Sequence, residues 1–199
     1  VSRDTYAFVH GIHQSTVKSL AKAETILGVA SLMADAIGRT ALPAYQQMLA
    51  EIVDAVVTLR AYIRTAEIDA IRDSYGFYVP NPDVMFTARN YFPKVYPRLI
   101  EIMQLVGSSG LMAIPDEADL NRPELATDID RYFQSATLMG HERVRLFRLA
   151  WDLCGSAFAG RQVLYERFFA GDPQALNAAR FGAFDQSEIA NRVRAFLAR

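Results

Sequence analysis

An arginine and a glutamine directly follow a run of small residues in the last quarter of the chain. Residues 155 to 160 are mostly glycine, alanine and serine, and Arg161 and Gln162 come next. A glycine inside a helix costs about 0.5–1 kcal/mol relative to alanine, so two of them indicate that another backbone or a flat ligand approaches closely. A cation beside an amide suits a phosphate group or the polar edge of a ring. Tight helix packing, with Arg161 paired to a carboxylate, is the alternative.

A second group of polar and small residues lies in the middle of the chain. Gln104 is followed by Gly107-Ser108-Ser109-Gly110, where a helical pattern runs into a turn. Such a turn exposes backbone N–H groups and can hold a phosphate or pyrophosphate. An ordinary glycine-rich helix end would account for the same residues.

Two of the three histidines, and the single cysteine, are candidate metal ligands or reactive groups. His10 and His13 stand one helical turn apart, but no His-Glu-x-x-His pattern surrounds them and no third ligand is evident. We therefore interpret them as structural or interface histidines and predict no metal site. Cys154 is the only cysteine, which excludes an internal disulfide and is compatible with a reducing cytoplasm. Its place on an apolar helix face predicts a small core residue.

Several segments resemble one protein family. They include Trp151-Asp-Leu, Gly160-Arg-Gln, Leu164-Tyr-Glu-Arg-Phe168 and Gly171-Asp-Pro173, and, earlier in the chain, Asp73 with Val79-Pro-Asn-Pro82, Tyr96-Pro-Arg-Leu-Ile-Glu101, Gly110-Leu-Met-Ala-Ile-Pro115 and Asp128-Ile-Asp-Arg-Tyr132. In this order they resemble the C-terminal domain of the 4-hydroxyphenylacetate 3-hydroxylase family. The resemblance covers nearly the whole chain, but not the long N-terminal part of the family's enzymes.

This resemblance implies a role in flavin-dependent oxygenation. The family's enzymes are the large components of two-component monooxygenases, which take reduced FAD from a separate reductase and hydroxylate a phenol, such as 4-hydroxyphenylacetate, ortho to its hydroxyl group. Their phenol-binding side chains lie in the N-terminal part, so we assign no catalytic residue here. The resemblance also implies a homotetramer, and we expect a cytoplasmic protein.

The same resemblance implies FAD contacts at both polar segments. The expected contact residues are Gln104, Gly107, Ser108, Ser109, Gly110, Ser156, Phe158, Ala159, Gly160, Arg161 and Gln162. Arg161 is expected to pair with a phosphate or with the isoalloxazine edge. Ala159 and Gly160 are expected to be positions where only a small residue fits.

Three other functions remain open at this point. Acyl-CoA dehydrogenases share the expected fold and use a similar Gln-x-x-Gly-Gly-x-Gly turn against the FAD of a neighbouring subunit; Ser108 stands at its second glycine. A dehydrogenase also needs a carboxylate base, but Glu166 and Glu188 are better explained as surface or capping charges. The related 4-hydroxybutyryl-CoA dehydratase holds an iron–sulfur cluster with a His and a Cys on its first helix, and no Cys lies near His13. A non-catalytic helical oligomerisation module is the third.

The elements that must position these residues are helices. Apolar spacing predicts four principal helices at 5–40, 43–75, 84–107 and 140–170, with Pro93 and Pro97 interrupting the third. Shorter helices are expected at about 125–135, from Asp172-Pro173 onward, and from a capping box at 185–188 to about Leu197. No segment alternates as a strand does. The fold prediction is a single all-α domain over 1–199, an up-down four-helix bundle like the acyl-CoA dehydrogenase C-terminal domain, whose wide apolar faces continue across a subunit interface.

Composition excludes several classes of partner. The chain has 199 residues, of which 51% are hydrophobic, and a net charge of −1. This charge favours neither a nucleic acid nor an anionic membrane. No window approaches the roughly 18 apolar residues of a membrane span, and no signal peptide is visible. Because the chain starts at Val1 directly in a periodic pattern, we expect a domain of a longer enzyme.

Overall fold

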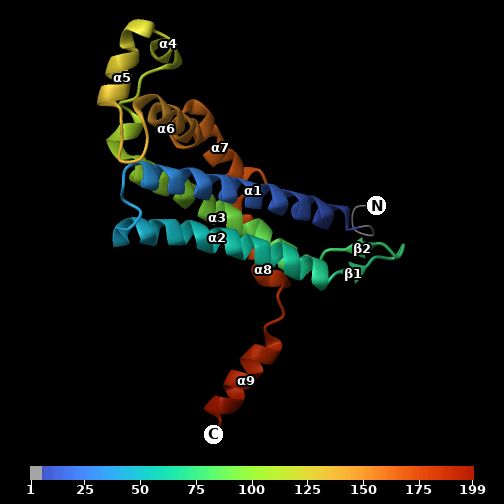
Figure 1. Cartoon of the computed structure of the whole chain (residues 1–199). Helices are drawn as coiled ribbons and strands as arrows, with labels where there is room; N and C mark the ends of the chain where they lie inside the picture. Colours follow the sequence, from blue (N-terminus) through green and yellow to red (C-terminus); the bar gives the residue numbers. More distant parts are fainter. Residues whose placement is uncertain (1–5) are drawn as a thin grey trace.

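Three long helices form the body of the protein. The computed structural model describes residues 6–199, so the expected helix start at Thr5 lies outside the described residues. The helices α1 (Ala7–Ala36), α2 (Pro43–Ile68) and α3 (Pro82–Gly107) lie side by side (Figure 1). Helices α1 and α2 run antiparallel as a hairpin, as predicted, because only a short turn joins them. Gly38, at φ +67°, lies just after the end of α1.

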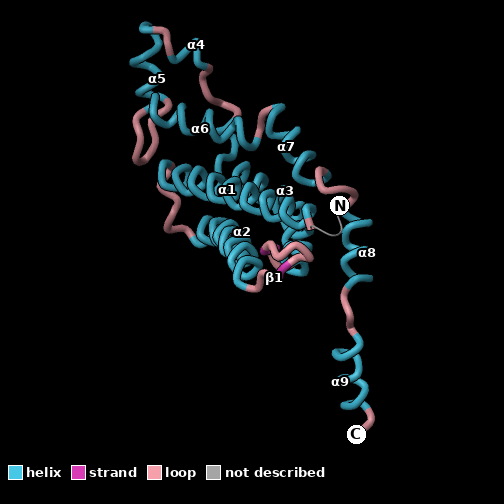
Figure 2. The backbone as a smooth tube through the Cα atoms, turned by 90° about the vertical axis from the view of Figure 1, so that its right-hand side faces the viewer, coloured by secondary structure: helices cyan, strands magenta, loops and turns pink. Residues whose placement is uncertain are grey.

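The remaining elements cover this body or extend from it. They are β1 (Ile71–Arg72), β2 (Tyr78–Val79), the 3-10 helices η1 (Ser108–Leu111) and η2 (Pro123–Leu125), and the helices α4 (Glu117–Leu120), α5 (Ala126–Tyr132), α6 (Gly140–Cys154), α7 (Ala157–Phe168), α8 (Pro173–Ala183) and α9 (Ser187–Leu197). Helices α6 and α7 pack against α1 and α3, α8 packs on α3, and α9 projects away from the body (Figure 2). No helix of the described chain is long and apolar enough to cross a membrane.

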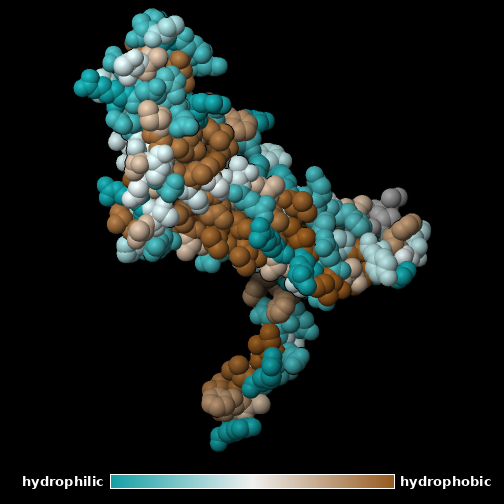
Figure 3. Space-filling view, viewed as in Figure 1, coloured by the Kyte–Doolittle hydropathy of each residue, from teal (hydrophilic) through white to brown (hydrophobic). Residues whose placement is uncertain are grey.

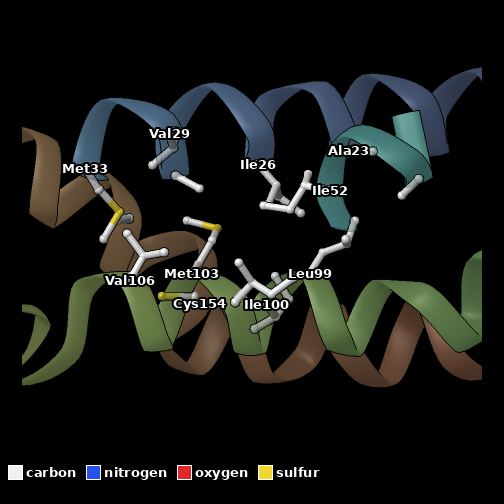
Figure 4. Packing of buried hydrophobic residues seen from close by; sticks show 14 of the residues in the cluster. Ala23, Ile26, Val29, Met33, Ile52, Leu99, Ile100, Met103, Val106 and Cys154 are labelled. Atoms are coloured by element: carbon white, nitrogen blue, oxygen red, sulfur yellow. The ribbon is translucent and has the colours of Figure 1, made fainter. Parts of the chain in front are cut away.

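The core lies where α1, α2, α3 and α6 meet. Side chains from these helices interdigitate in one cluster, among them Ala23, Ile26, Val29, Met33, Ile52, Leu99, Ile100, Met103, Val106 and Cys154 (Figure 4). Ala23, Ala30 and Ala34 of α1 are completely buried, and their small size lets the neighbouring backbones approach. The all-α class and the helical bundle are therefore as predicted.

The second predicted helix is shorter than expected. It ends at Ile68 rather than near residue 75, and a two-stranded hairpin follows in which Ile71 pairs with Val79. The Asp73 carboxylate accepts hydrogen bonds from the backbone N–H groups of Tyr75 and Phe77, and Gly76 adopts φ +84°. These contacts favour a turn over a further helical turn. Strands of two residues are too short to produce an alternating pattern, so the sequence did not predict this hairpin.

The third helix is more continuous than expected. Pro93 and Pro97 lie inside α3 and do not interrupt it. A proline in a helix interior costs about 3 kcal/mol. The flanking side chains Phe92, Tyr96 and Leu99 are almost fully buried, and this burial outweighs the local cost.

The C-terminal third also differs from its prediction. The helix expected over 140–170 is two helices, α6 and α7, which break at Gly155 and Ser156. The helix expected over 125–135 ends at Tyr132. Asp172 caps α8 as predicted, accepting from the N–H groups of Gln174 and Ala175. The expected capping box is absent from the described contacts of α9, because Asp185 instead accepts from the N–H of Ser187.

We predict that Gly140→Ala destabilises the protein. A Cβ at Gly140 would lie 2.0 Å from the backbone oxygen of Ile129, so α5 and α6 would have to separate. We expect the free energy of unfolding to fall by about 3 kcal/mol in urea denaturation followed by circular dichroism. Gly28→Ala is the control, because a Cβ there meets no atom within 4 Å and should stabilise α1 by about 0.5–1 kcal/mol. Equal stabilities of the two variants would contradict this packing.

Candidate functional site

The break between α6 and α7 is the centre of the candidate site. The N–H groups of Gly155 and Ser156 both donate to the carbonyl of Trp151, at 2.7 and 3.0 Å. A Cβ on Gly155 would lie 2.4 Å from the Trp151 ring. Within the described chain, a side chain at Gly155 is thus excluded by the Trp151 ring at the end of α6. The close approach of a second backbone, which the sequence suggested, is not the reason for this glycine. Ser156 starts α7, since its hydroxyl accepts from the N–H of Ala159 at 3.2 Å.

Gln104 connects the two polar segments found in the sequence. Its side-chain Nε2 donates to the carbonyl of Cys154, the last residue of α6, at 2.6 Å. The last turn of α3 is thereby held against the α6–α7 break. The structure thus brings Gln104 next to Gly155 and Ser156, although some 50 residues separate them in sequence.

In the turn after α3, the two glycines lie close to neighbouring side chains and the two serines are exposed to solvent. A Cβ on Gly107 would meet side-chain atoms of Leu111 and Met33 at 2.5 and 2.6 Å. Ser108 takes φ +47°, and both Ser108 and Ser109 are exposed. A Cβ on Gly110 would lie 3.1 Å from Phe147, seven residues before the end of α6. By the helix rise, the turn and the α6–α7 break are roughly 10 Å apart.

Arg143 lies beside this turn and was missed by the sequence reasoning. Its guanidinium carbon is 4.8 Å from the centroid of the Phe147 ring, and Nη1 donates to the carbonyl of Phe133 at 3.2 Å. Its Nε is buried and has no hydrogen-bond partner among the described residues. The guanidinium atom nearest the turn is Nη2, which lies 3.1 Å from a Cβ placed on Gly110, so the charge of Arg143 favours an anion at the turn. In sequence Arg143 was only one of several charges between apolar helix positions.

The predicted residues of α7 fall into two groups. Ala159 is buried, and Gln162 accepts a hydrogen bond from Lys22 Nζ at 2.7 Å, so both face the bundle. Gly160 and Arg161 are exposed, and a Cβ on Gly160 would meet no described atom within 4 Å. Within the described chain, the expectation that only a small residue fits is therefore met at Ala159, which is buried, but not at Gly160, where a side chain would meet no other atom. The described contacts of Arg161 include no hydrogen bond and no ion pair, so the expected alternative of a carboxylate partner is not seen there.

Glu166 is not the surface charge that the sequence suggested. It is 0% exposed, and Lys18 Nζ lies 2.8 Å from both of its carboxylate oxygens. Lys22 Nζ lies 2.5 Å from Oε1. Burial, and then the charge of Glu166, raise the pKa of the neighbouring Tyr96 to about 12. This ionic cluster fastens α7 to α1. Glu166 therefore has a structural role, which differs from the role of carboxylate base that the dehydrogenase hypothesis would give it.

A groove opens beside the ionic cluster. It has a volume of about 290 Å³ and lies between α1, α3, α6 and α7. Phe158 and Gln162 from the predicted set line it, together with Lys22 and Tyr96. Most of its lining residues are apolar, and Lys18, Lys22 and Gln162 add polar groups, so it combines a surface for a flat ring with donors for polar groups.

The histidines and the cysteine have structural surroundings. His13 Nε2 lies 2.9 Å from Glu67 Oε1 and connects α1 to α2, while His10 is exposed. The described residues contain no group of three His, Cys, Asp or Glu side chains that could hold a metal. Cys154 is 3% exposed, and burial raises the pKa of its thiol to about 11. The prediction that Cys154 is a core residue is confirmed.

We predict that Glu166→Ala weakens the protein. It would leave two ammonium groups close together without their counter-charge. We expect the free energy of unfolding to fall by about 2–3 kcal/mol, less than for a fully buried pair because the lysine side chains are 28% exposed. Glu188→Ala on α9 is the control and should change it by less than about 0.5 kcal/mol. Similar losses in both variants, measured by denaturant unfolding, would refute the anchoring role.

Comparison with known proteins identifies the family. The family model described as "4-hydroxyphenylacetate 3-hydroxylase C terminal" matches residues 2–198. The oxygenase component of 4-hydroxyphenylacetate 3-monooxygenase from Geobacillus sp. (strain PA-9) is 42% identical over 98% of this chain and 40% of its own length. The corresponding protein of Thermus thermophilus is 41% identical over 97% of this chain and 40% of its own length. The chain thus spans about 40% of the length of these relatives.

Solved structures agree with this comparison. The oxygenase component HpaB of 4-hydroxyphenylacetate 3-monooxygenase, complexed with FAD, matches 98% of this chain and 41% of its own chain, with a TM-score of 0.93 and 40% identity. An archaeal 4-hydroxybutyryl-CoA dehydratase matches with a TM-score of 0.78 at 18% identity, a likeness that extends to the fold alone. From the family match over nearly all residues, the chain belongs to the 4-hydroxyphenylacetate 3-hydroxylase family, in its C-terminal region.

Proposed function

We propose that this chain is the flavin-contacting and tetramer-forming C-terminal domain of a monooxygenase that depends on reduced FAD. Its substrate is a phenol such as 4-hydroxyphenylacetate, hydroxylated ortho to the hydroxyl group. The observation that carries the proposal is the identity of about 40%, over 99% of this chain, to a HpaB structure described as complexed with FAD and 4-hydroxyphenylacetate. Because the chain covers 41% of that protein, the phenol site is assigned to the remainder of the enzyme.

The residues around the turn after α3 fit a phosphate of FAD. Ser108 and Ser109 are exposed, and the guanidinium of Arg143 lies beside the turn, with Nη2 3.1 Å from a Cβ placed on Gly110. A pyrophosphate carries anionic oxygens that accept from N–H, hydroxyl and guanidinium donors. Gly107 and Gly110 would keep the turn close to the bundle, so that the serines form its outer surface.

The start of α7 fits a second anionic or polar part of the cofactor. The N–H groups of Ala157 and Phe158 lie in the first turn of the helix, where no intrahelical acceptor is available. Arg161 is exposed one turn further along, on the same short helix. Backbone donors, the helix dipole and a fixed cation together favour a phosphate or the oxygen-bearing edge of the isoalloxazine ring.

The domain contributes binding and shielding rather than proton transfer. When bound, reduced FAD supplies the two electrons with which O₂ is split between the phenol carbon and water. The side chains of this domain would hold the cofactor and exclude solvent from it. A separate reductase is part of the proposal, because the relatives are named as oxygenase components. A cytoplasmic location is also proposed, since free thiols and reduced flavin belong to a reducing compartment.

The proposed tetramer would cover apolar side chains that the single chain leaves open. Val53 and Val57 on α2 are 42% and 56% exposed, and Leu164 and Phe168 on α7 are 60% and 53% exposed. Some of these side chains can instead contact the rest of the polypeptide. Burial of either kind is favourable by about 25 cal/mol per Å² of apolar area.

We predict that Arg161→Ala lowers the affinity of the complete enzyme for reduced FAD about 10-fold or more, because a charge-assisted hydrogen bond is lost. The measurement is an anaerobic titration with reduced FAD, followed by a hydroxylation assay with 4-hydroxyphenylacetate. Arg64→Ala, which removes an exposed arginine on α2, should leave the affinity unchanged.

Two results of this titration would count against the proposal. An unchanged affinity in Arg161→Ala would exclude the role assigned to Arg161. If the unaltered enzyme bound no reduced FAD at all, the non-catalytic oligomerisation module would be the better description of this domain.

A further inference from the structure

A pocket between α3, the end of α7 and the start of α8 lies apart from the candidate site. It has a volume of about 280 Å³ and shares no lining residue with the groove beside the ionic cluster. The residues expected to contact FAD, all of which the structure describes, do not line it. Its size is at the lower end of the range for ligand pockets, so it suits a single ring with short substituents rather than a dinucleotide.

This pocket differs from the open apolar surfaces of the molecule. Hydrophobic residues cover broad areas of the body and gather along α9 (Figure 3). Broad surfaces of this kind suit contact with other polypeptide, whereas a pocket with walls on three sides suits a small ligand. Here the three walls come from α3, α7 and α8, which pack against one another.

Two cations at the pocket are available to a ligand. Lys94 of α3 and Arg167 of α7 both line it, and both are exposed. Neither side chain makes a hydrogen bond or an ion pair with a described residue. Because they come from different helices, one anionic group between them would connect α7 to α3.

The carboxylates nearest to this pocket in sequence are engaged elsewhere. Asp172 caps α8 through two backbone N–H groups, and Glu166 is held by the lysines of α1. Asp83 and Glu101 pair with arginines of α8 and α3. The charge at the pocket is therefore set by its two lining cations, and it favours an anionic group in the ligand.

Two further polar groups at the pocket have defined roles. Asn90 Nδ2 donates to the carbonyl of Leu176 at 3.1 Å and to Oδ1 of Asn177 at 3.5 Å, so Nδ2 of Asn177 is the donor left for a ligand. Pro97 has no N–H and cannot donate to the carbonyl of Pro93, one helical turn earlier. Besides its cations, the pocket thus offers one amide donor and one carbonyl acceptor.

The apolar walls of the pocket suit an aromatic ring. Pro93, Pro97, Pro173 and Leu176 form them. Proline rings pack well against aromatic rings, as they do when Pro-rich peptides bind aromatic grooves. An inorganic anion such as phosphate would gain nothing from these walls, whereas a ring that carries a carboxylate would use both the walls and the cations.

We propose that this pocket binds a small aryl carboxylate. Its carboxylate lies between Lys94 and Arg167 and accepts from Asn177, and its ring lies against the prolines. A hydroxyl group on the ring donates to the carbonyl of Pro93. This inference goes beyond the proposed function, which assigns the phenol site to the remainder of the enzyme; the pocket is a second site for the chemical class to which 4-hydroxyphenylacetate belongs.

The first test labels the site in the complete enzyme without FAD. 4-Azidobenzoate, activated by light, should label peptides that contain residues 90–97 and 173–177, with half-maximal labelling on the order of 0.1–1 mM. Phenylacetate should protect these peptides, and inorganic phosphate at the same concentration should not. Labelling confined to the remainder of the enzyme would overturn the inference. Equal protection by phosphate would also overturn it, because the pocket would then be a plain anion site.

The second test changes the charge of the pocket at constant shape. Asn177→Asp replaces the donor by a carboxylate that repels the ligand, so labelling of these peptides should weaken at least about 10-fold. Asn191→Asp, at an exposed asparagine of α9, is the matched control and should change it less than about 2-fold. Circular dichroism melting checks that both variants are folded. Labelling of Asn177→Asp equal to that of the unaltered enzyme would refute the assigned pocket.

Hydroxylation, measured on the same samples, separates this inference from the proposed function. Weak labelling of Asn177→Asp with unchanged hydroxylation supports a second site. An unaltered enzyme that is labelled at the pocket but hydroxylates no phenol contradicts the proposed function and supports the inference. 4-Hydroxyphenylacetate should protect at about 5-fold lower concentration than phenylacetate, since only its hydroxyl group can donate to the carbonyl of Pro93. Equal protection supports the aryl carboxylate site and excludes the role of that carbonyl.

Discussion

The candidate site depends on the break of one helix at Gly155 and Ser156. The Trp151 ring leaves no space for a side chain at Gly155, and Gln104 holds the last carbonyl of α6. Because α7 starts anew at Ser156, its first turn has unpaired N–H groups, and Arg161 follows within the same helix. An uninterrupted helix over 140–170 would pair these groups with carbonyls and leave no donors for an anion.

A buried ionic cluster then fixes the rotation of α7. Glu166 is held by Lys18 and Lys22 of α1, and Lys22 also donates to Gln162. Buried ion pairs seldom add much net stability, but they can specify one arrangement among several of similar energy. Here the arrangement places Gln162 and Glu166 toward the bundle and leaves Arg161 open to solvent. The cation is thereby available to a ligand or to another part of the enzyme.

Local pattern predicted the long helices, and tertiary contacts decided the rest. The apolar spacing of α1 and α2 and the Asp172-Pro173 start of α8 are local signals, and the structure confirms them. The effect of Pro93 and Pro97 was misjudged because the buried aromatic neighbours of α3 outweigh a local cost. Gly155 was misread because a small residue can mark either a close approach or a helix end. Glu166 could not be assigned, since its lysines lie more than 140 residues earlier. The buried side of Arg143 has no sequence signal.

The most direct test of flavin contact is hydrogen–deuterium exchange of the complete enzyme with and without reduced FAD, under anaerobic conditions. The N–H groups of Ala157 and Phe158 in the first turn of α7 have no intrahelical acceptor, so they should exchange rapidly in the free enzyme. The account predicts that reduced FAD slows exchange at residues 108–110 and 157–162. Tight binding of reduced FAD with unchanged exchange at both segments would contradict it.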